Sequence, residues 1–151
     1  MELKNQNGNL PWWEWPEKYS IHDKEELENW RKENQKELLG HNLLQWHLDR
    51  QWKSIRKQAE NLGIKLFGDV PFYVAKDSSD VWSNRELFSI LPNSDTYLQS
   101  GVPPDYFSET GQLWGNPVYR WSRHKANKYK WWRRRISRHL EQVDYLRIDH
   151  F

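Results

Sequence analysis

The chain has 151 residues, of which 23 are basic and 21 acidic, so its formal net charge is only +2. This charge creates no field that demands a polyanionic partner, and the absence of cysteine excludes disulfides and thiolate metal sites. Eleven tryptophans, seven tyrosines and five phenylalanines supply flat apolar faces with polar edges, which suit sugar rings or nucleic-acid bases.

The first 40 residues divide into an aromatic-rich loop and a mostly solvated helix. Pro11 and Pro16 enclose three tryptophans and disfavour a continuous helix, so we predict a loop or short turn. One interpretation is that these rings line a binding surface, but packing on a neighbouring element is the interpretation that we favour. Residues 23–38 are charged and helix-prone, with Asp23 as the expected N-cap.

A long amphipathic helix and a short strand follow. Apolar residues recur at helical spacing from residue 43 to 62, and we expect a buried stripe of Leu48, Trp52, Ile55, Ala59 and Leu62. Gly63 ends this helix, and the apolar run 64–71 predicts a strand that Pro71 keeps from continuing deep into a sheet. A helix, a glycine and a strand in this order indicate one step of an α/β fold.

Residues 71–116 form a long connection with little periodicity, apart from expected helical turns at 79–82 and 86–88. Loops of this length inside a compact domain are usually functional. Within this one, paired prolines stiffen the backbone and hold two adjacent aromatic residues outward, Tyr106 and Phe107.

Asn116 is expected to cap a helix that begins at Pro117 and runs to about Gln142. Its predicted buried stripe is Tyr129, Trp132, Ile136, Leu140 and Val143. The opposite face is basic and carries Lys128, Lys130, Arg133, Arg134, Arg135 and Arg138. A basic helix with aromatic residues can bind a nucleic-acid backbone, but a solvated face is the commoner explanation and the one we favour.

The last seven residues alternate between aliphatic and charged side chains. In a strand, Leu146 and Ile148 would pack on one face while Arg147 and Asp149 share the other. Chemistry in an α/β barrel is placed at the carboxyl ends of strands, and the arginine would favour an ionised carboxylate. Asp149 is therefore the candidate nucleophile, with a surface ion pair on an edge strand as the alternative.

The sequence lacks the motifs that are typical of several classes of chemistry. We find no HExxH pair, GxSxG elbow, phosphate-cradling glycine loop or dinucleotide fingerprint, so we expect no metal site and no cofactor. There is also no run of about 20 apolar residues, and we expect a cytoplasmic protein without membrane contact. Two strand-end aspartates and a stiff aromatic loop remain, which is compatible with a retaining glycosidase-type site.

Four runs in the chain resemble the 4-α-glucanotransferases, also called amylomaltases or disproportionating enzymes, of glycoside hydrolase family 77. They are residues 68–75, 77–82, 101–117 and 147–151, of which the third is long and highly specific. The resemblance implies an α/β fold in which the chain is part of a (β/α)8 TIM barrel. Residues 63–70 and 145–150 would be its third and fourth strands, with 71–116 as an active-site insertion within 41–151.

The resemblance also implies roles for individual residues. Asp149 matches the nucleophile that forms a covalent glucosyl-enzyme intermediate, and Arg147 matches the arginine that supports it. The matched substrate-binding positions are Asp69, Tyr106, Phe107, Trp114 and His150. The aromatic loop would keep water from the intermediate, which favours transfer over hydrolysis. The implied partners are α-1,4-glucans and maltooligosaccharides, and not nucleic acid.

In the family, the acid/base glutamate and the third carboxylate lie beyond the strand that residues 145–150 match. A (β/α)8 barrel also needs about 250 residues, so we expect an internal fragment that has no transferase activity of its own. A non-catalytic α-glucan-binding protein, which keeps the aromatic cleft without the chemistry, is the alternative. Apolar stripes without neighbours would leave the isolated chain poorly soluble or loosely packed.

Overall fold

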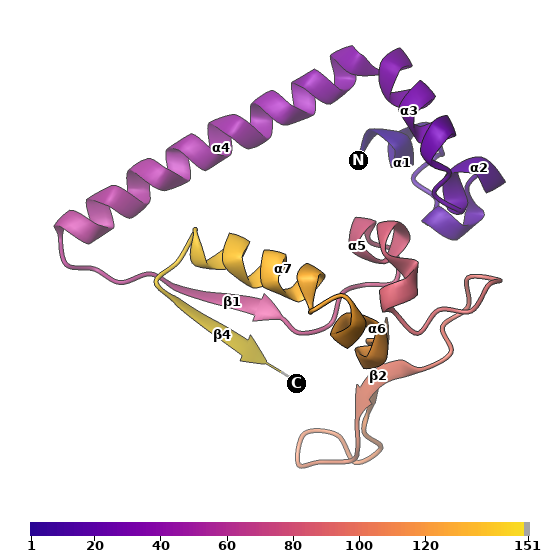
Figure 1. Ribbon diagram of the computed structural model, residues 1–151. Coiled ribbons are helices and arrows are strands. Elements are labelled where there is room, and N and C mark those ends of the chain that lie inside the picture. The colour runs from indigo at the N-terminus through magenta and orange to yellow at the C-terminus, as the bar shows by residue number, and fades with distance from the viewer. Residues whose placement is uncertain (150–151) are drawn as a thin grey trace.

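The computed structural model describes residues 1–149, whose helices and strands are shown in Figure 1. In chain order they are α1 (Glu2–Gln6), η1 (Trp12–Glu14), α2 (Glu17–Ser20), α3 (Lys24–Glu33), α4 (Gln35–Asn61), β1 (Phe67–Pro71), α5 (Ser79–Ser83), η2 (Arg85–Leu87), β2 (Gln99–Val102), β3 (Gln112–Pro117), α6 (Trp121–Ala126), α7 (Lys130–Leu140) and β4 (Tyr145–Asp149). The strands form a parallel pair, β1 with β4, and an antiparallel pair, β2 with β3. The predicted α/β class is confirmed.

The parallel pair joins two distant parts of the chain, because α5, α6, α7 and both other strands lie between β1 and β4 in the sequence. Hydrogen bonds of Leu66, the residue before β1, connect the beginnings of the two strands. The Leu66 amide donates to the Asp144 carboxylate at 2.9 Å, and the Leu66 carbonyl accepts from the amides of Asp144 and Tyr145. The hydrogen bond from Leu66 lowers the pKa of Asp144 below its ordinary value. Val70 of β1 is fully buried, and α7 lies along the pair in Figure 1.

The main core consists of aromatic rings gathered around Tyr119. The ring centre of Tyr119 lies 5.0 Å from Trp132, 5.3 Å from Phe88 and 5.4 Å from Phe72. Trp12 is also buried, and its indole donates to the Lys76 carbonyl at 2.7 Å. For Trp12, the interpretation that the early tryptophans pack on a neighbouring element is therefore confirmed.

The helix predicted after Asn116 is wrong in two respects. β3 continues through Asn116 to Pro117, and the first helix begins only at Trp121. Lys128 and Tyr129 then both adopt positive φ angles of 56° and 55°. That conformation cannot continue a right-handed helix, so α6 and α7 are separate elements.

Other local predictions fare better. Asp23 caps α3, because its carboxylate accepts from the Glu26 amide at 3.0 Å. The helix predicted over 23–38 nevertheless ends at Glu33, since Asn34 leaves the helical conformation before α4 begins. The two expected helical turns are confirmed as α5 and η2, whereas the β2–β3 hairpin was not predicted.

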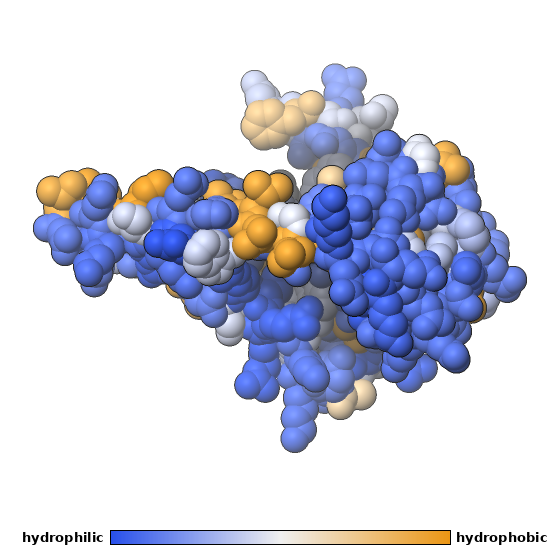
Figure 2. Space-filling model, turned by 90° about the horizontal axis from the view of Figure 1, so that it is seen from above, coloured by the Kyte–Doolittle hydropathy of each residue, from blue (hydrophilic) through white to orange (hydrophobic). Residues whose placement is uncertain are grey.

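The predicted buried stripes are largely exposed. On α4 only Ala59 is buried, whereas Leu48, Ile55 and Leu62 each expose half or more of their surface. Figure 1 shows α4 as one long arm that runs from α3 towards the start of β1, and Figure 2 shows apolar residues spaced along this arm. On α7 the stripe is partly confirmed, because Trp132 is buried although Leu140 is exposed.

The carboxyl half of α4 satisfies the unpaired carbonyls at the end of α7. The Trp52 indole donates to the Gln142 carbonyl at 2.8 Å, and Arg56 donates to the carbonyls of Leu140 and Glu141. The last carbonyls of a helix have no partner within it, so such donors stabilise its end. This contact fixes the turn that leads from α7 into β4.

Arg56→Ala should lower the free energy of unfolding by about 1 kcal/mol, because two carbonyls lose their charged donor. Denaturant unfolding followed by circular dichroism measures the change. The neighbouring Lys57 is exposed, and Lys57→Ala should stay within about 0.5 kcal/mol of the parent chain. An equal loss in both variants would contradict a specific role for Arg56.

Candidate active site

The exposed face of the parallel pair carries three charged residues. Asp69 lies opposite Arg147, and Pro71 lies opposite Asp149, so the three predicted charges share one face, with Asp149 at the carboxyl end of β4. The Arg147 Nε donates to Asp149 Oδ1 at 2.7 Å. This hydrogen bond raises the pKa of Arg147 above its ordinary value, and the charge of Asp69 adds a smaller effect. The prediction that Arg147 and Asp149 share one strand face is confirmed.

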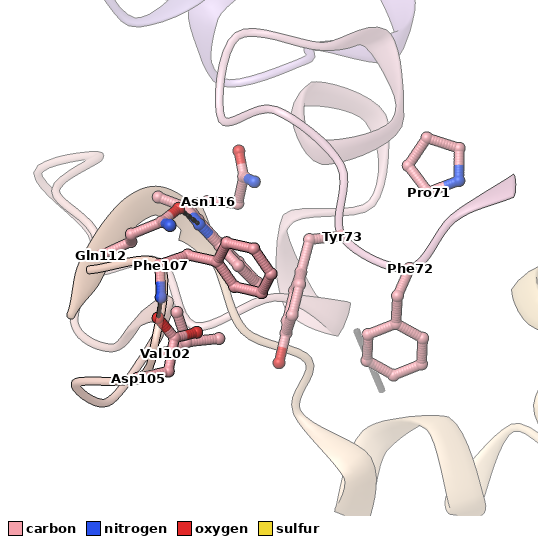
Figure 3. Close-up of a pocket in the computed structure, with 9 residues that line it drawn as sticks. Pro71, Phe72, Tyr73, Val102, Asp105, Phe107, Gln112 and Asn116 are labelled. Carbon is pink, nitrogen blue, oxygen red and sulfur yellow. Dashed lines mark hydrogen bonds between the residues drawn. The ribbon is translucent and has the colours of Figure 1, made fainter. Parts of the chain in front are cut away.

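A pocket of about 470 Å3 begins at Pro71, the register partner of Asp149. One wall is the segment that follows β1, and the other is the β2–β3 hairpin with its connecting loop (Figure 3). The lining residues are Pro71, Phe72, Tyr73, Val102, Asp105, Phe107, Gln112, Trp114 and Asn116. The volume falls within the range typical of small-molecule sites.

Aromatic rings dominate this pocket. In Figure 3 the Tyr73 ring points into it between Phe72 and Phe107. The ring centres of Tyr73 and Trp114 are 6.3 Å apart, and the Trp114 indole donates to the Gln112 side chain at 3.0 Å. Flat apolar faces with fixed polar edges are suited to the two sides of a sugar ring.

Asp105 shapes the loop between the hairpin strands. Its carboxylate accepts from the amides of Phe107 at 2.9 Å and Ser108 at 2.8 Å. Gly111 closes the loop with a φ of +73°, and any side chain there would clash with the Val102 carbonyl. The loop therefore holds Tyr106 and Phe107 outward by its own hydrogen bonds, without core packing.

The structure brings together only part of the predicted binding set. Phe107 and Trp114 line the pocket, whereas Tyr106 is 96% exposed and packs edge-on against Phe107 at 5.7 Å. Asp69 lies on the charged strand face, and His150 lies outside the described residues. Phe72 and Tyr73 were missed as lining residues, although their position directly after the carboxyl end of a strand was a usable signal.

The basic face predicted on residues 128–138 is partly engaged within the protein. Arg135 donates to the Pro71 carbonyl at 2.7 Å, and Arg138 forms ion pairs with Asp49 and Glu141. Within residues 1–149 no group of three or more acidic or histidine side chains is arranged to hold a metal ion. Nor does any helix of that range have the length and apolar character needed to cross a membrane.

Gly101→Ala should destabilise the hairpin wall of the pocket. A Cβ at Gly101 would clash with the Gln112 backbone carbonyl, which cannot move without breaking the strand pairing. We expect a loss of about 1–3 kcal/mol in the free energy of unfolding. Gly40→Ala on α4 meets no atom within 4 Å and should instead be neutral or stabilising by up to about 1 kcal/mol. Equal behaviour of the two variants in denaturant unfolding would contradict this close approach.

Comparison with known proteins identifies the family. The family model described as 4-alpha-glucanotransferase matches residues 1–151. The 4-alpha-glucanotransferase of Synechocystis sp. is 42% identical over 152 residues, which cover 100% of this chain and 30% of the relative. For that of Thermus thermophilus the identity is 41% over 151 residues, with the same coverage of 100% and 30%.

A solved structure supports the same family assignment. An amylomaltase from Streptococcus agalactiae in complex with acarbose matches with a TM-score of 0.91 and 37% identity, over 99% of this chain and 30% of that one. The chain thus spans about 30% of the length of the relatives it matches. Because the match extends over all 151 residues, the chain belongs to the 4-alpha-glucanotransferase family, glycoside hydrolase family 77.

Proposed function

We propose that this chain supplies the nucleophile and one aromatic wall of a 4-α-glucanotransferase site, which transfers α-1,4-glucan segments between maltooligosaccharides. The observation that carries the proposal is the Arg147–Asp149 pair on a strand end whose register partner, Pro71, begins the aromatic pocket. The relatives named 4-alpha-glucanotransferase support the reaction, and the amylomaltase solved with acarbose favours a sugar ligand.

The proposed reaction is a retaining double displacement. Asp149 attacks the anomeric carbon, the bond to the leaving sugar oxygen breaks, and a glucosyl ester forms on the carboxylate. A hydroxyl of a second glucan then attacks the same carbon, its proton passes to the general base that earlier protonated the leaving sugar, and the bond to Asp149 breaks. Arg147 orients the carboxylate, while the loop bearing Phe107 excludes water so that a sugar acceptor is favoured.

The leaving sugar oxygen must also receive a proton from a general acid. On the charged face of the described strand pair, Asp69 is the other carboxylate beside Asp149. We assign Asp69 to ordering the substrate, because it lies opposite Arg147, one pleat away from the strand end. The proton donor must then come from elsewhere in a complete site.

The proposal includes the architecture of the complete protein. β1 and β4 would be the third and fourth strands of a (β/α)8 barrel, with residues 71–116 as the active-site insertion and 1–40 as a peripheral aromatic-rich segment. Parallel pairing, a carboxylate at the carboxyl end of β4 and the match to the amylomaltase support this arrangement. The exposed stripe of α4 would then pack against other barrel elements.

A non-catalytic α-glucan-binding protein is the second candidate. The pocket lining does not include Asp149, so the aromatic wall alone can account for sugar binding. The two functions differ in whether the carboxylate at position 149 is needed.

Asp149→Asn separates the two candidates in a chimera, in which this chain replaces the matching segment of the Streptococcus agalactiae amylomaltase. Loss of the nucleophile should lower maltotriose disproportionation at least about a thousandfold. Acarbose affinity, measured by calorimetry, should change less than about tenfold. Glu60→Gln on the exposed side of α4 is the matched control and should retain activity. Transfer that survives Asp149→Asn would leave only the binding function.

The 151-residue chain on its own should not disproportionate maltotriose, because a carboxylate nucleophile without its acid cannot expel the leaving sugar efficiently. Chromatography of the products checks this expectation. Glucose together with oligomers longer than maltotriose would show that these residues already hold a competent acid.

A further inference from the structure

Two successive backbone carbonyls are bound by side chains at the point where the chain leaves β1 for the pocket wall. Arg135 of α7 donates to the Pro71 carbonyl at 2.7 Å, and the Tyr119 hydroxyl donates to the Phe72 carbonyl. These carbonyls flank the step from the register partner of Asp149 to the aromatic residues of the pocket. Side chains from two other parts of the chain, α7 and the connection between β3 and α6, thus hold the path of this segment.

Both donors are themselves held firmly. The Arg135 guanidinium lies over the rings of Trp131 at 5.1 Å and Trp132 at 5.7 Å, which restricts its planar fork. Tyr119 is 5% exposed and packed in the aromatic core. Burial raises the pKa of Tyr119 well above its ordinary value, so the phenol keeps its proton and remains a donor.

Burial of the Arg135 guanidinium also carries an energetic penalty. Its Nη1 is buried and finds no hydrogen-bond partner among the described residues. A buried donor without a partner is energetically unfavourable, and an apolar side chain could pack against the two tryptophans without this cost. Packing alone therefore does not explain an arginine at this position. The hydrogen bond to Pro71 is the specific contact that an apolar side chain of similar length would lack.

We propose that Arg135 and Tyr119 are positioning residues, which keep residues 71–73 preorganised so that the aromatic wall stands in a fixed place relative to Asp149. This inference rests on the proposed function of the site. Without the two hydrogen bonds the segment would have to be ordered at each binding event, which weakens binding. In a variant without these hydrogen bonds, the bound sugar would hold the wall in place. The chemical step would then proceed at nearly the rate of the parent protein.

Kinetics of the chimera test this consequence. Arg135→Met and Tyr119→Phe should each raise KM for maltotriose about fivefold to tenfold, with kcat lowered less than about twofold. Arg135→Lys keeps a donor for the Pro71 carbonyl and should stay within about twofold of the parent KM. Arg134→Met and Tyr129→Phe, at exposed positions of the same region, are the matched controls and should leave KM unchanged. A merely structural role would instead lower Tm and kcat together with KM unchanged, which would overturn the proposal.

A second measurement examines the contact itself in the chimera. Labelling phenylalanine with carbonyl 13C and tyrosine with 15N selects Phe–Tyr peptide bonds, of which the 151-residue sequence has one, between Phe72 and Tyr73, and Phe72→Leu identifies its signal. Tyr119→Phe should move the Phe72 carbonyl resonance upfield, whereas Tyr129→Phe should not. An unchanged Phe72 resonance would overturn the proposal whatever the kinetics show.

The two proposals fail in different ways. If Asp149→Asn leaves transfer intact in the chimera, the nucleophile assignment falls, yet the KM of the Arg135 and Tyr119 variants still decides whether they position the wall. If Asp149→Asn abolishes transfer while both variants keep the parent KM, the proposed function stands and the positioning role is wrong.

Discussion

The parallel pairing of β1 with β4 is the constraint on which the rest of the site depends. It places Asp69 opposite Arg147 and brings Asp149 beside Pro71, where the pocket begins. A two-stranded sheet has little stability of its own, so its geometry must be imposed by its surroundings. Three features supply that support: the hydrogen bond between Leu66 and Asp144, the contact of α4 with the end of α7, and the burial of Val70.

The aromatic core and the aromatic pocket share their rings, which gives a physical reason for the high tryptophan and tyrosine content. Phe72 packs on Tyr119 in the core and also lines the pocket. Tyr73 stacks nearly parallel to Tyr119, with an angle of 12° between the planes, and points into the pocket. Rigid rings packed on one side can present the other side to a ligand at little entropic cost. Packing stability and the proposed sugar binding thus depend on the same residues, 71–73.

How far the sequence predicts this structure depends on whether a pattern is local. Alternation in the last strand correctly placed Arg147 and Asp149 together, because the strand period alone determines the face. Asn116 and Pro117 suggested a helix start, but hairpin pairing overrides that local preference. The stripe of α4 shows that apolar periodicity predicts a helix without saying what covers it. The pocket wall at residues 71–73 depends on contacts from α7 and Tyr119, which no local pattern reveals.

The proposed reaction requires Asp149 to form a covalent bond to the transferred sugar. This bond can be detected by acid quenching of the chimera during turnover of maltotriose, followed by peptide mapping with mass spectrometry. We expect a peptide that carries Asp149 with one or more added glucose units, linked as an ester to that side chain. Turnover without any such adduct, or with the sugar on a different carboxylate, would contradict it.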